Sequence, residues 1–217
     1  MEFESGELAL DFSAQGARPE WLGLTGLGDN VYLSWADGTT WRCDVHELAS
    51  LRVAEKRDLL EERELRVTAR EFLIGRTSLL VGDSSGRLRV WFASRRDDAG
   101  TPDGMELVRA HEFAGRGVAL TALARSARRR LLAAGYADGT VRMFHSTSQR
   151  ELLEARLPGT ASPVTGLAIA PKDDALLAVG AGGRILWNLD APHTETSMAA
   201  LFTPIWYETF PEPEHFW

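Results

Sequence analysis

Hydrophobic and polar residues follow one pattern that occurs four times along the chain. Each copy is an apolar run, a polar turn that ends in glycine, and an alternating run that ends in a bulky residue. The copies are residues 31–44 (VYLSWADGTTWRCD), 78–92 (SLLVGDSSGRLRVWF), 130–144 (RLLAAGYADGTVRMF) and 175–188 (ALLAVGAGGRILWN). Alternation with a period of two is typical of half-buried strands. The pattern therefore predicts four β-hairpins.

The turns of these hairpins support the prediction. Asp-Gly, Ser-Gly and Gly-Gly pairs accept the positive φ that a tight turn demands. The turn glycines are Gly38, Gly86, Gly139 and Gly183, and they are separated by 48, 53 and 44 residues. These spacings are close to the roughly 40–50-residue periods of propeller repeats. A repeat architecture is therefore expected.

Further strand candidates surround each hairpin. Apolar alternating runs precede the third and fourth hairpins at 118–123 and 164–169, and more charged runs at 106–109 and 151–154 suit outer strands. Four strands per unit make one propeller blade. We therefore expect an all-β, propeller-like fold of about four blades, each with four antiparallel strands. It would form a compact ring, part of a ring, or half of a ring that a second copy completes as a homodimer.

Other segments set the expected boundaries. Residues 57–66 (RDLLEERELR) are helix-forming by composition, whereas the repeat phase places an outer strand and its turn in the second half of this stretch. Residues 95–104 are expected to form a polar loop. The propeller-like domain is expected to cover residues 1–191, with an extended tail of aromatics and prolines at 192–217. Residues 7–12 (ELALDF) are a candidate outer strand to close the circle.

Composition narrows the classes of function. With 24 Lys and Arg against 31 Asp and Glu, the net charge is −7, which argues against nucleic acid as a partner. The single cysteine, Cys43, excludes an internal disulfide and a cysteine-built zinc site, and is expected to be a small buried apolar residue. A membrane-spanning helix needs about 20 consecutive apolar residues, and no run approaches that length.

No motif in the chain predicts catalysis, a cofactor or a metal. The glycines at 180–183 lack a following Lys-Ser or Lys-Thr and are better explained by a hairpin turn. His145 and the hydroxyls that follow it lack a third orienting group. The most interesting charged feature is a basic cluster, which comprises Arg125, Arg128, Arg129 and Arg130. Guanidinium forks suit phosphate or another anion, and the alternative is a solvated loop.

The repeats resemble those of the WD-repeat β-propeller family. Ala110-His111 stands where that family has Gly-His, Asp138-Gly139 lies at its strand turn, and Trp91 ends a strand where the family has its tryptophan. The resemblance implies that His111, Asp138 and Trp91 help to tie blades together. Phe144 replaces a tryptophan in the third unit, so the repeats are degenerate.

Three segments also resemble the extracytoplasmic region of proteobacterial phosphate ABC transporter permeases. They are 79–92 (LLVGDSSGRLRVWF), 141–153 (VRMFHSTSQRELL) and 205–217 (IWYETFPEPEHFW), and the likeness spans residues 65–217. It implies a periplasmic, non-catalytic interaction or regulatory domain of a bacterial inner-membrane protein. The partners would be transporter subunits and a periplasmic phosphate-binding protein, with membrane helices flanking this sequence. The tail would meet the membrane through Trp206, Tyr207, Phe210 and Trp217.

Two other functions stay open. The first is a soluble WD-repeat scaffold that mediates protein–protein contacts. The second is a propeller-based hydrolase, which would need a central pocket lined by His111, Asp138 and Asp83.

Overall fold

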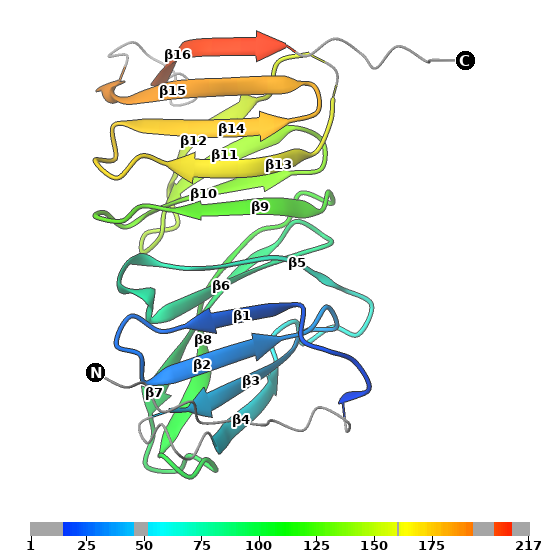
Figure 1. Cartoon of the computed structure of the whole chain (residues 1–217), viewed down its shortest axis with the longest axis vertical. Coiled ribbons are helices and arrows are strands. Elements are labelled where there is room, and N and C mark those ends of the chain that lie inside the picture. The colour runs from blue at the N-terminus through cyan, green and yellow to red at the C-terminus, as the bar shows by residue number, and fades with distance from the viewer. Residues whose placement is uncertain (1–14, 46–51, 160, 193–201, 210–217) are drawn as a thin grey trace, which may run out of the picture.

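The chain folds into four β-sheets that follow one another along the long axis of the molecule (Figure 1). The computed structural model describes residues 15–45, 52–159, 161–192 and 202–209, with the backbone alone at 190–192 and 202–209. In these ranges sixteen strands form four antiparallel sheets of four strands each. We number the sheets as blades 1 to 4. The fold is the all-β, WD-repeat-like propeller architecture that the repeats predict.

The strands run in sequence order within each blade. Blade 1 contains β1 (Trp21–Leu24), β2 (Asn30–Ser34), β3 (Thr39–Asp44) and β4 (Arg52–Asp58). Blade 2 contains β5 (Val67–Phe72), β6 (Ser78–Asp83), β7 (Leu88–Arg95) and β8 (Met105–Phe113), with a short 3-10 turn, η2 (Ile74–Arg76), between β5 and β6. Blade 3 contains β9 (Leu120–Arg125), β10 (Leu131–Tyr136), β11 (Thr140–His145) and β12 (Glu151–Arg156). Blade 4 contains β13 (Val164–Ile169), β14 (Ala175–Gly180), β15 (Gly183–Pro192) and β16 (Phe202–Thr209).

The four predicted hairpins are confirmed as the central strand pairs β2–β3, β6–β7, β10–β11 and β14–β15. Their turns use glycine for the predicted reason, since Gly86 and Gly139 have φ values of 80° and 82°. Residues 120–123 of the run at 118–123 and the whole run at 164–169 lie in the first strands of blades 3 and 4. The charged runs at 106–109 and 151–154 lie in the fourth strands of blades 2 and 3.

The helix that composition favours at 57–66 does not form. Strand β4 ends at Asp58, and residues 59–66 form turns and a loop. Leu59 and Leu60 are both fully buried in the core between blades 1 and 2, and the Leu60 amide donates to Asp58 Oδ1 at 2.9 Å. Burial of two consecutive leucines against neighbouring blades outweighs helix propensity. The turn expected from the repeat phase is present, but the outer strand lies earlier than expected, because β4 covers Arg52–Asp58 and not the second half of the stretch.

The end of the chain contributes to blade 4. Residues 202–209, which the sequence analysis places in an extended tail, form β16 and pair with β15. This pairing makes β16 the outer, fourth strand of blade 4, the position that β4, β8 and β12 hold in the other blades. The candidate closing strand at 7–12 lies outside the described residues. Within them, blades 1 and 4 lie at opposite ends of the molecule, so these two blades do not close a compact ring (Figure 1).

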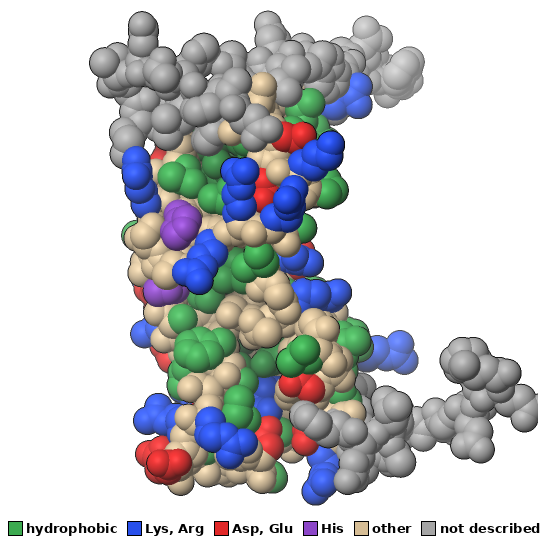
Figure 2. Space-filling model, turned by 90° about the vertical axis from the view of Figure 1, so that its left-hand side faces the viewer, with side chains coloured by type: hydrophobic (Ala, Val, Ile, Leu, Met, Phe, Trp, Pro, Cys, Tyr) green, Lys and Arg blue, Asp and Glu red, His purple; other side chains and the backbone are tan. Residues whose placement is uncertain are grey.

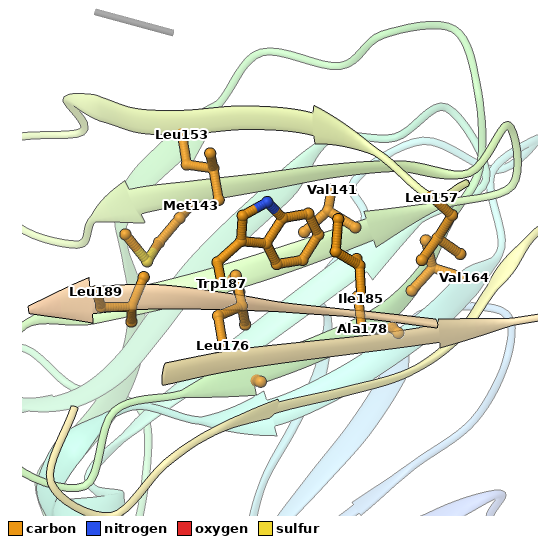
Figure 3. Packing of buried hydrophobic residues seen from close by; sticks show 13 residues of the cluster. Val141, Met143, Leu153, Leu157, Val164, Leu176, Ala178, Ile185, Trp187 and Leu189 are labelled. Atoms are coloured by element: carbon orange, nitrogen blue, oxygen red, sulfur yellow. The ribbon is translucent and has the colours of Figure 1, made fainter. Parts of the chain in front are cut away.

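Hydrophobic residues fill the space between successive blades. Between blades 3 and 4, Trp187 and Leu176 pack against Met143 and Leu153 (Figure 3). Glycines in the second strands allow this close approach. A Cβ atom at Gly82 would lie 2.6 Å from Leu120 Cδ2, and one at Gly135 would lie 2.5 Å from Val164 Cγ1. Each glycine therefore accommodates the first strand of the next blade.

A cross-strand pair recurs three residues before and three residues after the turn glycine. In blade 1 the pair is Trp35 and Trp41, whose ring centroids are 5.1 Å apart. In blade 2 it is the fully buried ion pair of Asp83 and Arg89. In blade 3 the side chains of Tyr136 and Arg142 interact electrostatically. The position is therefore filled by an interacting pair in three blades, although the chemistry of the pair differs each time.

The boundary between blades 1 and 2 is unusually polar. The side chain of Arg42 in β3 is fully buried, and its guanidinium donates to Asp103 Oδ1 at 3.0 Å and to the Met105 carbonyl at 2.7 Å. Across the same boundary, the Leu107 amide donates to Glu55 Oε2 at 3.0 Å. The predicted polar loop at 95–104 is confirmed, and through Asp103 it also joins the two blades.

Candidate interaction surface on the loop ends of blades 3 and 4

Three hairpin loops of blades 3 and 4 end on the side of the molecule that is at the left of Figure 1 and faces the viewer in Figure 2. They are residues 126–130, 146–150 and 170–174. The first two are in contact, since the Ser146 amide donates to the Arg130 carbonyl at 2.7 Å. Five exposed basic side chains lie on these loops: Arg128, Arg129, Arg130, Arg150 and Lys172. We call this set the basic rim.

The turn at residues 126–130 presents its arginines to solvent. Ser126 is fully buried, and its Oγ accepts the amides of Arg128 at 2.9 Å and Arg129 at 2.6 Å. A hydroxyl that binds the backbone two and three residues ahead stabilises a tight turn. The buried serine therefore holds the following arginines outward.

An ion pair links this turn to blade 4. Arg129 Nε lies 3.7 Å from Asp173 Oδ2, and the Arg129 side chain is 60% exposed whereas Asp173 is fully buried. Asp173 has φ of 62°, and neither of its carboxylate oxygens has a hydrogen-bond partner among the described residues. Its electrostatic partner in these ranges is Arg129. The Nε side of the Arg129 guanidinium therefore faces blade 4.

The predicted basic cluster is divided by the structure. Arg125 lies on β9, half-buried, with its Nε 3.5 Å from Glu71 Oε1 of blade 2. It therefore joins blades, whereas Arg128, Arg129 and Arg130 are on the exposed turn. Arg125 also lines a hollow of about 250 Å³ between the first strands of blades 2, 3 and 4. The hollow is lined by Glu71, Leu123, Ala124, Arg125, Ala127, Leu167, Ala168 and Ile169.

The basic rim carries a net positive charge, whereas the chain as a whole is acidic. The three loops contain five basic residues and two acidic ones, Asp173 and Asp174, in a chain whose net charge is −7. Figure 2 shows Lys and Arg side chains gathered over this side of the molecule, with fewer acidic ones between them. Arg150 and Lys172 belong to this surface although the sequence analysis did not select them. The signal that could have found them is the repeat phase, which brings these loops to the same side.

The three candidate blade-tying residues lie in separate environments. Trp91 is fully buried in the core between blades 1 and 2. Asp138 caps its own turn, with Oδ1 accepting the Thr140 amide at 3.0 Å. His111 lies on β8, where Nδ1 is 3.2 Å from Gln149 Nε2. No hydrogen bond among the described residues joins His111 to Asp138.

The residues considered for a hydrolase site do not share one described pocket. Asp83 is fully buried, and its carboxylate binds Arg89 and accepts the Ser85 amide at 2.8 Å. Within the described residues, no group of three or more His, Cys, Asp or Glu is placed to hold a metal ion. Cys43 is fully buried, as predicted, and burial raises the pKa of its thiol to about 11. Its surroundings are those of a core residue.

The candidate membrane-junction residues are described only in part. Trp206 and Tyr207 lie on β16, of which the backbone is described, and Phe210 and Trp217 lie outside the described residues. In the described ranges the structure contains no helix with the length and apolarity needed to span a membrane.

Comparisons with known proteins show the fold of the chain. No family model matches the chain, and no curated protein matches it. Among solved structures, a chain of the mitotic checkpoint complex matches with a TM-score of 0.60 and 14% identity, over 96% of this chain and 59% of that one. The β-propeller domain of Cps50 (Swd1) from Myceliophteria thermophila matches with a TM-score of 0.58 and 15% identity, over 73% of this chain and 46% of that one.

A designed protein is similar too. The computationally designed Ika4 protein matches with a TM-score of 0.54 and 24% identity, over 74% of this chain and 85% of that one. These likenesses establish a WD-repeat-like β-propeller fold. The chain spans 59% and 46% of the two natural chains.

Proposed function

We propose that the chain is a non-catalytic interaction module that binds a protein partner through the basic rim. The observation that carries the proposal is the gathering of five exposed cations on three loop ends in an acidic chain. Exposed charged residues on loops held by a rigid scaffold are characteristic of binding surfaces. The similar chain from the mitotic checkpoint complex is part of an assembly, which supports a role in protein contacts for this fold.

Site-specific photocrosslinking in the native cell tests this proposal. A photoreactive amino acid replaces Arg129 on the basic rim, and in a matched strain it replaces Arg63, an exposed arginine in the 59–66 loop. We expect a discrete crosslinked protein from position 129 and none from position 63. Crosslinking that is absent at 129, or the same at both positions, would contradict the proposal.

A second candidate function is the extracytoplasmic module of a phosphate-type ABC permease. It is supported by the resemblance of residues 79–92, 141–153 and 205–217 to that family. On this proposal residues 1–191 together with β16 form the docking domain, and the tail at 192–217 meets the membrane through Trp206, Tyr207, Phe210 and Trp217. A rigid domain would act on transport only if its contacts differ in energy between two transporter states.

Calorimetric titration with the cognate phosphate-binding protein, with and without phosphate, tests this second function. Binding that depends on phosphate supports it. An absence of heat in both conditions, or a full-length reading frame without flanking membrane spans, would exclude it in favour of a WD-repeat scaffold.

A further inference from the structure

We infer that the basic rim and the adjacent hollow bind an acidic peptide segment of the partner that carries one apolar side chain. This inference rests on the proposed function and adds the chemistry of the segment. It follows from three features of the described residues: the orientation of Arg129, the excess of positive charge, and the position of the hollow.

Arg129 is oriented for a second carboxylate. Its Nε faces Asp173 at 3.7 Å, while 60% of its side chain is exposed. A guanidinium presents donors in a planar fork, so a carboxylate near Nε leaves donors at the Nη groups for another anion. The buried Asp173 therefore holds Arg129 in one direction, and a partner carboxylate supplies the outer contact.

The remaining charges favour an anionic segment of several residues. Asp173 offsets Arg129, and Asp174 is half-buried beside it. Arg128 and Arg130 flank Arg129 on the exposed turn, and Lys172 lies on the neighbouring loop. Guanidinium and ammonium groups on separate loops match carboxylates spaced along a peptide, and such complementarity contributes to specificity and to the rate of association.

The hollow supplies the second contact. Ala127 lines it and also belongs to the turn that carries the arginines, so the hollow and the basic rim are continuous. Leu123, Leu167 and Ile169 line it and are only half-buried. The hollow is open to solvent, most of its surface is polar, and Glu71 and Arg125 also line it. Its volume of about 250 Å³ has room for one side chain. We place an apolar side chain of the bound segment against the three aliphatic side chains, close to the acidic residues of the segment.

A membrane surface fits these features less well. A flat bilayer contacts protruding groups and leaves a recess between strands unfilled. The net charge of −7 also opposes the approach of the whole chain to an anionic membrane. A peptide is therefore the occupant that uses both the charge and the hollow.

Fluorescence anisotropy with a labelled peptide tests the inference. The probe is a peptide of Asp and Glu residues around a single Leu; its controls replace that Leu by Ser, or every acidic residue by Lys. We expect binding that weakens with added salt, and weaker binding of both control peptides. The variant R128Q/R129Q/R130Q should bind about tenfold more weakly, since each exposed pair contributes a factor of about two. The matched control R63Q should bind as the parent does.

A second variant tests the hollow separately. Leu167→Asn should weaken binding of the Leu peptide to the level of the Ser peptide, while leaving binding of the Ser peptide unchanged. Thermal unfolding of each variant verifies that the fold is retained.

Several outcomes would overturn the inference. They are equal binding of the triple variant and the parent, equal binding of the Lys peptide, or tight binding to phosphatidylserine vesicles without binding to the peptide. Competition by inorganic phosphate at the same concentration as the peptide would assign the site to a small anion. If photocrosslinking at position 129 succeeds while every acidic peptide fails, the proposed function stands and the acidic segment does not.

Discussion

Arg42 and Asp103 show how a single residue can join two blades. The Arg42 side chain is fully buried, whereas that of Asp103 is 23% exposed. The hydrogen bond from Arg42 lowers the pKa of Asp103 to about 2, against an ordinary value of 3.8. A carboxyl group whose pKa is lowered by folding binds its proton more readily in the unfolded chain, so protonation favours unfolding.

The pair predicts a defined pH dependence. The stabilisation from Asp103 is complete above about pH 5 and is lost as the pH falls from about 4 to about 2. Asp103→Asn removes a charged hydrogen-bond partner of Arg42 and should lower the free energy of unfolding by about 2–3 kcal/mol at pH 7. Urea unfolding of both proteins from pH 7 to about pH 2.5 measures this. The difference between them should shrink toward low pH; a constant difference would contradict the assignment.

Residue-level chemistry was predictable only where it depended on neighbours in sequence. The burial of Cys43 follows from its place in an alternating run, and it is confirmed. The burial of Arg42 one position earlier does not follow, because besides Asn30 and Glu55 of its own blade it depends on Asp103, in a loop 61 residues away. A charged residue next to an apolar one is ordinarily assigned to the solvent face. Arg42 is buried instead because it forms an ion pair with Asp103 of blade 2.

At the scale of elements, the interacting pair around the turns of blades 1, 2 and 3 stabilises each hairpin, and the WD resemblance did not predict it. Asp83 accepts the amides of Ser85 and Arg87 and pairs with Arg89. One buried carboxylate therefore both closes the turn and neutralises the opposite strand. The equivalent positions in blade 1 are filled by two tryptophans.

Breaking one half of this pair should cost more than replacing both halves. Arg89→Leu leaves Asp83 buried without its cation and should destabilise the chain by about 3–5 kcal/mol. Asp83→Asn in the same protein removes the stranded charge, so the double variant should be more stable than Arg89→Leu alone. Arg87→Leu, at a partly exposed ion pair with Glu62, is the control and should cost less than about 1 kcal/mol. Additive effects in denaturant unfolding would contradict a coupled pair.

The hairpins were predictable because their signals are local. The turn glycines and the alternation beside them specify β2–β3, β6–β7, β10–β11 and β14–β15. The loop at 59–66 was not resolved from sequence, since its leucines are buried only because two blades meet there. The pairing of β16 with β15 could not be predicted from local signals either, because residues 193–201 separate the two strands in the sequence.

The close packing of successive blades depends on glycines in the second strands. Gly82→Ala would place a Cβ atom 2.6 Å from Leu120 Cδ2 and should lower the free energy of unfolding by about 1–3 kcal/mol. Gly100→Ala is the matched control, since Gly100 lies in the loop after β7 and a Cβ atom there would have no neighbour within 4 Å. It should change the free energy of unfolding by less than about 0.5 kcal/mol in urea. Equal effects would show that the blades have room to separate.

At the scale of the whole molecule, the candidate surface was found from sequence only in part. The arginines at 128–130 are adjacent in sequence and were identified as a group. Arg150 and Lys172 join them because hairpin loops of successive blades end on the same side of the molecule. Arg125 was grouped with them by sequence alone, whereas its ion pair with Glu71 places it between blades.

The outward face of blade 1 shows what a blade presents when no described neighbour covers it. The residues that pair with the position five before each turn glycine are Leu22, Arg70, Leu123 and Leu167. Three of them contact the preceding blade: Arg70 donates to Ser34 Oγ at 2.9 Å, and Leu123 and Leu167 pack against the inter-blade cores. Leu22 is instead 65% exposed, and Leu24 beside it is 43% exposed.

This difference predicts unequal costs at equivalent positions. Leu22→Ser removes a side chain that is 65% exposed and should change the free energy of unfolding by less than about 0.5 kcal/mol. Leu24→Ser removes one that is 43% exposed and should cost less than about 1 kcal/mol. Leu167→Ser removes a side chain that packs between blades 3 and 4 and should cost about 1–3 kcal/mol. Urea unfolding at a low protein concentration compares the three. A cost at Leu22 as large as that at Leu167 would mean that blade 1 is covered in solution, because only burial makes a leucine expensive to replace.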